Sequence, residues 1–240
     1  MKIIVLSATN YKEKDGVVQT LTPNGVVSFT VKGLYDGKSK NGPLTNQMTI
    51  AEIDSLDGRY RYPLIKSSTI IHSPIKTDAT LEYYSALSVL EETTIKLMQD
   101  EEKGMMFKHL EAAVVALKNS KDPWMILLVY IANVLKATGY ECQVTCCVRC
   151  GKRKDIRIFS FKEGGFVCGK CLREGMTDDL TNDQKMLLRS AFLSPDYVHI
   201  SDFLTKENAI ALLLKFRDFI FDSYGVLIQS INNLIEYSKK

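Results

Sequence analysis

Two short stretches, Cys147-Val148-Arg149-Cys150 and Cys168-Gly169-Lys170-Cys171, determine how the middle of this chain folds. Each is a Cys-x-x-Cys pair, and seventeen residues separate the two pairs. Two such pairs at this spacing are typical of a structural zinc site, because each pair curls over a tight knuckle and points both sulfurs at one ion. Four thiolates at about 2.3 Å complete a tetrahedron and leave no position for a catalytic water. We therefore predict one structural Zn²⁺ ion bound by Cys147, Cys150, Cys168 and Cys171.

Two other interpretations of these cysteines are open: buried reduced thiols, or two disulfides. Disulfides require an oxidising compartment, and the apolar run that opens the chain is too short for a signal peptide. Cys142 and Cys146 also lie nearby, and Cys146 could compete with Cys147 as a ligand. The spacing to Cys150 and the glycine that follows it favour Cys147.

On both sides of the cysteines the apolar residues follow a helical period. Before them, Asp122-Pro123 provides a helix cap and a proline at the first helical position, and the helix stops at Gly139. Its segment 124–132 is apolar nearly all round, which predicts the buried centre of a bundle. This is the longest apolar run and is too short to cross a bilayer, so we expect a soluble, cytoplasmic protein without membrane contact. The predicted helices are 81–98, 105–117, 123–138, one that follows a capping box at Thr181–Gln184, 206–224 and 226–237.

The N-terminal part has the pattern of short strands, and Thr22-Pro23-Asn24-Gly25 is typical of a hairpin turn. The predicted strands are 2–8, 17–21, 26–31, 48–53, 60–65 and 68–71. Five or so strands in under 80 residues suggest a small barrel, with the OB-fold as the natural candidate and other small barrels still open.

The predicted fold class is therefore α+β: an N-terminal OB-fold β-barrel followed by an all-helical domain with an inserted four-cysteine zinc ribbon. The predicted domains are residues 1–78 (barrel), 79–141 (first helical part), 142–175 (ribbon) and 176–240 (second helical part). An insert this short needs the metal because it cannot build a core of its own. Without the metal we expect the ribbon to unravel while the barrel and the bundle survive.

Charge is unevenly distributed along the chain, although the net charge is only +3. Residues 142–175 carry eight basic and three acidic side chains, and residues 1–78 are also net positive. A polyanion is therefore expected to contact the barrel and the ribbon segment.

No catalytic motif stands out. The histidines His72, His109 and His199 lie in separate segments without a partner nucleophile, and no phosphate-binding glycine loop is present. Asp178, Asp179 and Asp183 could bind magnesium in a nuclease, but they also stand where a helix begins and would favour its dipole. We therefore expect that the protein is not an enzyme. Magnesium-dependent cleavage of DNA would favour a nuclease, and failure to bind oligonucleotides at low salt would favour an architectural subunit that contacts only proteins.

A segment after the third predicted strand, residues 32–41, combines glycines with lysines and an aromatic ring. Lysines meet phosphates, and a tyrosine can stack on a base for about 1–3 kcal/mol. Such a mixture on a small barrel favours single strands over duplex, and the alternative is an ordinary solvated loop. The candidate DNA-binding residues are Lys32, Tyr35, Lys38, Lys40, Lys12, Lys14, Arg59 and Arg61, the last two interleaved with Tyr60 and Tyr62.

Taken together, these motifs resemble the bacterial RecO family of recombination mediators in order and spacing over nearly the whole chain. The resemblance is carried by the stretches 3–15, Thr22-Pro-Asn-Gly25, Val31-Lys32-Gly33 with Lys38-Ser39, 127–139, Cys147 to Gly151, Phe159-Ser160-Phe161, and 164–168. The sequence departs from the family at Tyr35 and Asp36, where relatives often carry further basic residues.

That resemblance implies an OB-fold, a helical domain and an inserted zinc ribbon. It also implies binding of single- and double-stranded DNA, annealing of complementary strands, and a complex with RecR. It further implies contact with the acidic C-terminal tail of single-stranded DNA-binding protein, so that RecA loads at gaps, with RecF as an indirect participant. By position, Lys32, Lys38 and Lys40 match basic DNA-contact positions of the family. Asp36 lowers the local positive charge, and some relatives lack the four cysteines.

Overall fold

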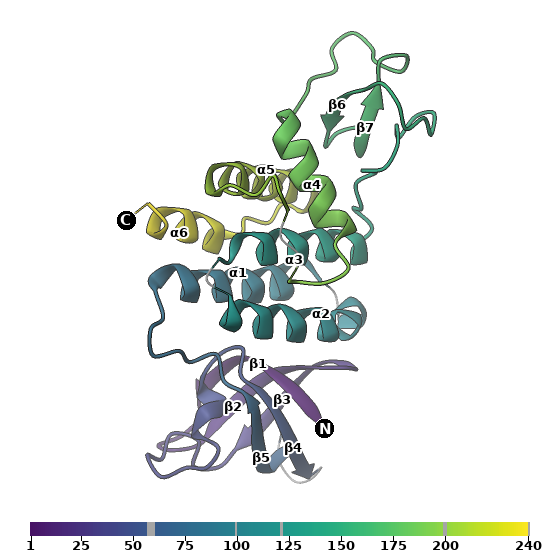
Figure 1. The fold of residues 1–240 in the computed structure, drawn as a ribbon. Helices are drawn as coiled ribbons and strands as arrows, with labels where there is room; N and C mark the ends of the chain where they lie inside the picture. Colours follow the sequence, from purple (N-terminus) through teal and green to yellow (C-terminus); the bar gives the residue numbers. More distant parts are fainter. Residues whose placement is uncertain (57–60, 99, 121, 199–200, 240) are drawn as a thin grey trace.

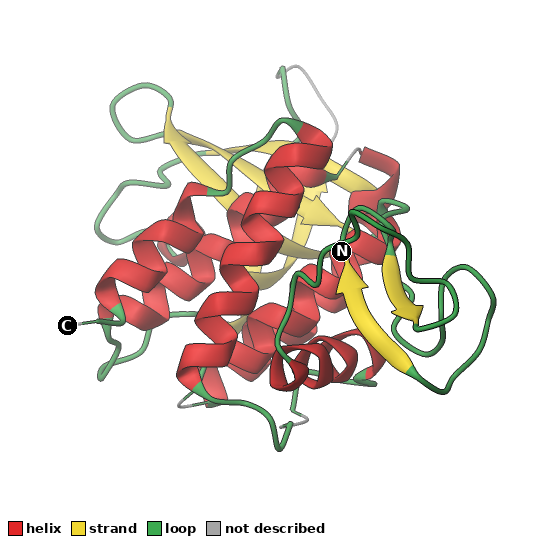
Figure 2. Ribbon diagram, turned by 90° about the horizontal axis from the view of Figure 1, so that it is seen from above, coloured by secondary structure: helices red, strands yellow, loops and turns green. Residues whose placement is uncertain are grey.

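The computed structural model describes residues 1–56, 61–98, 100–120, 122–198 and 201–239. Three parts follow one another along the long axis of the molecule (Figure 1). A β-barrel occupies one end, a layered body of helices lies in the middle, and a small two-stranded ribbon lies at the other end. Seen from the ribbon end, the helices lie in front of the barrel strands (Figure 2).

The N-terminal strands close into a five-stranded barrel in the order β1-β2-β3-β5-β4. The strands are β1 Lys2–Asn10, β2 Gly16–Thr22, β3 Gly25–Val31, β4 Ile50–Leu56 and β5 Leu64–His72, with a short 3₁₀ helix η1 Gly42–Thr45 between β3 and β4. All pairs are antiparallel except β3 with β5, where Thr30 pairs with Leu64 in parallel. This order with its single parallel closure is that of an OB-type barrel, so the predicted barrel is confirmed.

The prediction of two separate strands at 60–65 and 68–71 was wrong, because the single strand β5 Leu64–His72 covers 64–65 and 68–71 without a break, and residues 61–63 lie before it. The register of β5 against β4 shifts where Asp54 pairs with Ser67 and Ser55 pairs with Ile65, which leaves Lys66 as the extra residue of a bulge. The bulge interrupts the alternation of apolar and polar residues without ending the strand.

The helical body consists of α1 Leu81–Leu97, α2 Asp100–Asn119, α3 Trp124–Ala137, α4 Asn182–Leu193, α5 Lys206–Tyr224 and α6 Gln229–Tyr237. The residues of α3 from Trp124 to Ala132 are all buried, as its all-round apolar sequence predicts. The predicted capping box is also present, since Thr181 and Gln184 exchange side-chain and backbone hydrogen bonds. Two boundaries differ: α2 begins at 100 instead of 105, and α6 begins at 229 instead of 226.

The barrel is joined to the helices by a shared core. Ile4, Leu6, Leu21, Met48 and Ile50 belong to the same buried cluster as the helices, whereas the barrel interior forms a second cluster. Lys2 also forms an ion pair with Glu111 of α2, with the nitrogen 2.7 Å from the carboxylate oxygen.

At Gly104, helix α2 touches the β2–β3 turn so closely that a Cβ atom would lie 2.8 Å from the carbonyl oxygen of Pro23. The hairpin turn of the barrel therefore faces the helices. The opposite ends of β2 and β3, at Gly16 and Val31, face away from them.

The ribbon, residues 142–175, is built on a hairpin of β6 Ile156–Ser160 and β7 Gly165–Cys168. Its inner face is aromatic and belongs to the main helical core: Phe159 and Phe166 are buried there, and the ring of Phe161 stacks on Phe219 of α5 at 4.8 Å. Only the end that carries the cysteines has a small cluster of its own. Within the described residues, no helix combines the length and apolar character needed to cross a bilayer.

Candidate metal centre and nucleic-acid interface

The four predicted ligands meet at one point. The sulfur atoms of Cys147, Cys150, Cys168 and Cys171 all lie within 4.8 Å of one another. The sulfurs of Cys150 and Cys168 are 3.6 Å apart, which is close to the edge of about 3.8 Å that a tetrahedron with 2.3 Å metal–sulfur bonds requires. All six cysteines carry free thiols, so the disulfide alternative fails. The residues present therefore fit a metal ion with four thiolate ligands.

The backbone folds each pair into a knuckle by the same device. The amide of Gly151 donates to the carbonyl of Cys147 at 2.8 Å, and the amides of Cys171 and Leu172 donate to the carbonyl of Cys168 at 2.9 and 3.0 Å. Gly151 has a φ of +71°, a conformation that a glycine adopts without strain. This explains why a glycine follows Cys150.

Two thiols of the cluster have shifted pKa values. Burial opposes ionisation of Cys147, but hydrogen bonds from the backbone near Cys168, Arg149 and Cys150 outweigh it and lower its pKa to about 6. Hydrogen bonds with Cys150, followed by burial, raise the pKa of Cys171 to about 12. Because the thiolate is the form that binds a metal, a bound cation would displace any thiol protons of the cluster.

The two remaining cysteines lie outside the cluster, as the spacing predicts. Cys142 is buried in the helical core, where burial, with the charge of Glu141, raises its pKa to about 12. Cys146 is half-buried and does not join the cluster.

Supporting contacts that the sequence did not reveal hold the knuckles in place. Arg149 donates from two nitrogens to one carboxylate oxygen of Glu163, at 3.0 and 2.6 Å, and so ties the first knuckle to the β6–β7 turn. The amide of Gly169 in the second knuckle donates to the carbonyl of Asp155 at 2.9 Å. These pairs join segments that are 14 residues apart in the chain and carry no sequence signature.

The prediction that Asp178 and Asp179 serve the start of a helix was wrong. Their carboxylates accept the amides of Phe159 in β6 and of Phe161 just after it, at 3.0 and 2.9 Å, and Asp178 also pairs with the buried Lys185 at 2.5 Å. They fasten the ribbon to the helical body, and Asp183 alone of the three lies in the first turn of α4.

At the far end of the barrel, contacts join the β1–β2 loop to the segment after β3. The amide of Tyr35 donates to the carbonyl of Lys14 at 2.9 Å, and the amide of Gly33 donates to the carboxylate of Asp15 at 2.8 Å. The ring of Tyr35 lies over Gly16, where a Cβ atom would approach it to 3.1 Å. The β4–β5 loop reaches the same end, since the amide of Thr30 donates to the carbonyl of Pro63 at 2.8 Å.

The charges at this end are partly neutralised. Asp36 forms an ion pair with Lys14 at 3.2 Å. The backbone amide of Lys38, followed by Lys14, lowers the pKa of Asp36, so this carboxylate stays ionised. By contrast, Lys38 and Lys40 are exposed and their ammonium groups have no partner among the described residues.

The other candidates are distributed around the same end. Lys12 lies over the exposed ring of Tyr11 at 5.4 Å, and Arg61 lies over the ring of Tyr62 at 5.4 Å. Lys32 is exposed at the end of β3 and already interacts with another group of the protein. Arg59 and Tyr60 lie outside the described residues, as does His199.

Neither described histidine is placed for catalysis. Burial, together with Lys118 for His72 and Lys136 for His109, lowers the pKa of both rings. His109 of α2 contacts the hydroxyl of Tyr197, in the segment between α4 and α5, at 3.2 Å.

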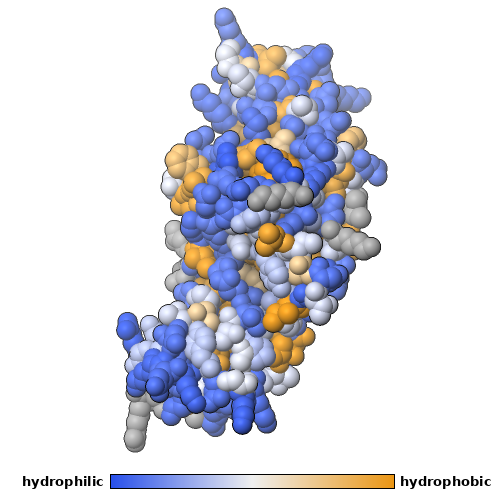
Figure 3. All heavy atoms as spheres, turned by 90° about the vertical axis from the view of Figure 1, so that its left-hand side faces the viewer, coloured by the Kyte–Doolittle hydropathy of each residue, from blue (hydrophilic) through white to orange (hydrophobic). Residues whose placement is uncertain are grey.

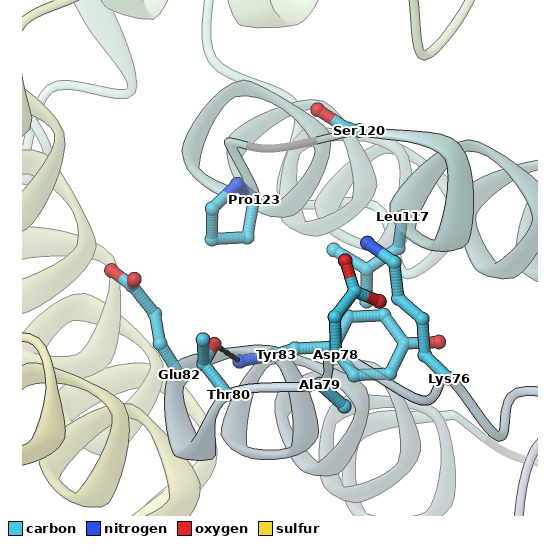
Figure 4. Close-up of a pocket in the computed structure, with 9 residues that line it drawn as sticks. All are labelled: Lys76, Asp78, Ala79, Thr80, Glu82, Tyr83, Leu117, Ser120 and Pro123. Atoms are coloured by element: carbon cyan, nitrogen blue, oxygen red, sulfur yellow. Dashed lines mark hydrogen bonds between the residues drawn. The ribbon is translucent and has the colours of Figure 1, made fainter.

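A cavity of about 240 Å³ lies at the start of α1 (Figure 4). Thr80 there caps the helix by accepting the amide of Tyr83.

The fold and the cysteine cluster define a class of protein: an OB-type barrel joined to a helical body that carries a four-cysteine centre able to hold a metal ion. The family model described as recombination protein O C terminal matches residues 79–224, which span the helices α1 to α5 and the ribbon. The DNA repair protein RecO of Caldicellulosiruptor bescii is 30% identical over 179 residues, which cover 72% of each chain. The RecO of Thermoanaerobacter sp. (strain X514) is 26% identical over 81% of this chain and 79% of its own.

The chain therefore belongs to the RecO family, a family of DNA repair proteins.

Proposed function

We propose that this protein is a recombination mediator that binds single- and double-stranded DNA and anneals complementary strands without covalent chemistry. The observation that carries the proposal is the contact of the β1–β2 loop with the segment after β3 at the barrel end remote from the helices, with Pro63 of the β4–β5 loop on the neighbouring strand, in a chain of the RecO family. OB-type barrels bind nucleic acid with the loops β1–β2 and β4–β5 and the adjacent strands. Both loops lie at this end.

The contacts at this end indicate which side chains would bind phosphates and which would stack on bases. Lys38 and Lys40 are free to meet phosphates, and the exposed ring of Tyr35 can stack on a base, whereas Tyr62 is half-buried with Arg61 over its ring. Lys12, Lys32, Arg61 and Arg59 complete the proposed DNA-binding set. Lys14 contributes less, because Asp36 already neutralises it. Annealing needs phosphate repulsion lowered while the bases remain free to pair, and mobile surface lysines meet that need.

The metal we assign to the cysteine cluster is one Zn²⁺ ion with a structural role. Four thiolates at tetrahedral spacing suit zinc. A site filled by four protein ligands stabilises the fold and leaves no position for a catalytic water. The proposed function accordingly assigns no active site and no enzymatic step. The domain division at 78, 141 and 175 separates a DNA-binding barrel from a helical body interrupted by the zinc ribbon.

The proposed partners are RecR, the acidic tail of single-stranded DNA-binding protein, and through them RecA and RecF at the nucleoid. A hollow of about 460 Å³ lies between the ribbon and α5, with the stacked pair Phe161 and Phe219 as its apolar wall. Its charged lining residues are Lys162, Lys215, Asp179, Asp218 and Asp222, so an acidic tail would meet a net negative surface there. We therefore do not place the tail in this hollow.

The test is the salt dependence of binding to a short labelled single strand. Each phosphate contact on a single strand adds about −0.7 to the slope of log K against log salt. Lys38→Glu with Lys40→Glu should weaken binding and reduce that slope by about 1.4. The matched control, Lys108→Glu with Lys239→Glu, makes the same charge change on exposed lysines of α2 and the C-terminal end and should leave the slope unchanged. An unchanged slope in the first variant would remove these lysines from the DNA interface.

A further inference from the structure

The end of the ribbon carries basic side chains that the barrel site does not include. The loop after the first knuckle reads Lys152-Arg153-Lys154, and the second knuckle contributes Lys170 and Arg173. All of these residues are exposed.

Among the described residues, these five cations form no ion pair, whereas two other basic residues of the ribbon do. The two basic residues of the ribbon that do form ion pairs are Arg149, with Glu163, and Arg157, with Asp155. Among the described residues, the loop and knuckle cations have no acidic partner and no recorded hydrogen bond from their side chains. The barrel end is less positive than its sequence suggests, because Lys14 is neutralised. The ribbon end is therefore the more open source of positive potential.

The cysteine cluster is what brings the two basic segments together. The amide of Cys147 donates to the carbonyl of Lys152 at 2.7 Å, so the loop is anchored on a ligand residue. The second knuckle is joined to the same loop by the bond from Gly169 to Asp155. Four thiolates on a divalent ion would add about two negative charges; Cys147 and Cys168 are buried, Cys171 is half-buried and Cys150 is exposed. The five exposed cations of the two segments outnumber those charges, so the surface stays net positive.

The chemistry of this surface favours the sugar–phosphate backbone as the ligand. The ribbon's aromatic rings, Phe159, Phe161 and Phe166, pack toward the helices and are not available to stack on bases. The exposed apolar residues are Val148 and Leu172, at 39% and 44% exposure, which is too little apolar surface for the core of a protein interface. A surface that meets phosphates without stacking accepts duplex and single strand alike.

The position of this surface gives it a distinct role. The ribbon lies at one end of the molecule and the barrel at the other, with the helical body between them (Figure 1). Hydrophilic side chains cover much of the face seen in Figure 3, both ends included, with apolar ones scattered among them. We propose that Lys152, Arg153, Lys154, Lys170 and Arg173 form a second DNA-backbone site, so that one chain holds two DNA segments at once. This rests on the proposed function, in which the barrel holds one of the two. Two sites on one chain would raise the local concentration of one strand near another.

A bridging assay tests the proposal: biotinylated duplex on beads, a labelled non-complementary single strand in solution, and the protein with its metal bound. Wild type should retain the labelled strand on the beads. Arg153→Glu with Lys154→Glu should lower retention at least tenfold and reduce the salt slope for duplex binding by about 1.8, from two lost contacts. Its metal content should match wild type, which shows that the ribbon is folded. The control Lys108→Glu with Lys239→Glu should bridge like wild type.

The outcomes separate the two proposals. Bridging by Arg153→Glu with Lys154→Glu at the level of the control would overturn the second site and leave the barrel site standing. If the wild-type protein binds no DNA, both the barrel site and the second site are overturned. If the ribbon variant loses affinity for polyglutamate but binds and bridges DNA normally, the ligand of this surface is an acidic protein and the DNA assignment is wrong.

Discussion

Removal of the metal should open the cysteine end of the ribbon and leave the helical body folded. The small cluster at that end buries Ile158 and Val167 with two of the cysteines, and two such side chains contribute about 3–6 kcal/mol. Ordering the backbone of the two knuckles, roughly ten residues, costs about 10–20 kcal/mol. The deficit is similar to the roughly 10–16 kcal/mol that zinc supplies to small peptides. The knuckles therefore depend on the metal.

Trypsin provides the assay, because the exposed loops contain its cleavage residues, among them Lys152, Arg153 and Lys170. When opening is fast relative to cleavage, the cleavage rate follows the open population, and each 1.4 kcal/mol changes it about tenfold. Chelation of the metal should raise the rate of cutting in these loops at least about a hundredfold. Cuts in α3 should not accelerate, since Phe159 and Phe166 still pack into the helical core.

Matched cysteine variants identify the cause. Cys150→Ser removes an exposed ligand and should reproduce the effect of the chelator, whereas Cys146→Ser removes a thiol outside the cluster and should cut like wild type. If complete loss of metal left the loops as resistant as before, the knuckles would be held by protein contacts alone and the energetic argument would be wrong.

Two further predictions concern the joint between the barrel and the helices. Burial, with the charge of Glu92, raises the pKa of Glu91 to about 7, while Gln47 donates to it at 2.8 Å. Protonated Glu91 carries no charge, so its burial does not oppose folding at low pH. This advantage is lost as the pH rises through about 7 and the carboxylate ionises. Glu91→Gln should therefore melt about 2–4 °C above wild type at pH 8, on the order of 1 kcal/mol after allowance for solvent screening, and no higher at pH 4.5; an equal gain at both pH values would refute this. A glycine-to-alanine substitution inside a helix normally raises the free energy of unfolding by about 1 kcal/mol. At Gly104 the new Cβ would lie 2.8 Å from the carbonyl oxygen of Pro23 in the β2–β3 turn, so we expect Gly104→Ala to lower the melting temperature. A higher melting temperature would show that the contact is loose.

Local signals in the sequence were sufficient for the features that depend on neighbouring residues. The two Cys-x-x-Cys pairs, the capping box at Thr181 and the all-round apolar helix at 124–132 are confirmed. Each is decided within a few residues by ligand spacing, a cap hydrogen bond or the absence of a polar face.

Features that depend on distant residues could not be predicted from the sequence. The parallel closure of the barrel pairs Thr30 with Leu64, and the contact of Gly104 with the β2–β3 turn joins the helical body to the barrel. Asp178 stands where a helix-start residue would stand, yet its carboxylate bonds to Phe159, 19 residues earlier. In the same way, the pairing of Lys14 with Asp36 that weakens the barrel site needs the two loops to meet.

Annealing of complementary oligonucleotides coated with single-stranded DNA-binding protein, in the absence of ATP, tests the central claim most directly. The account predicts faster annealing with the protein than without it, and a smaller gain with Lys38→Glu and Lys40→Glu than with the control Lys108→Glu and Lys239→Glu. An annealing rate that the wild-type protein leaves unchanged, with no binding to the bare strands, would contradict the account.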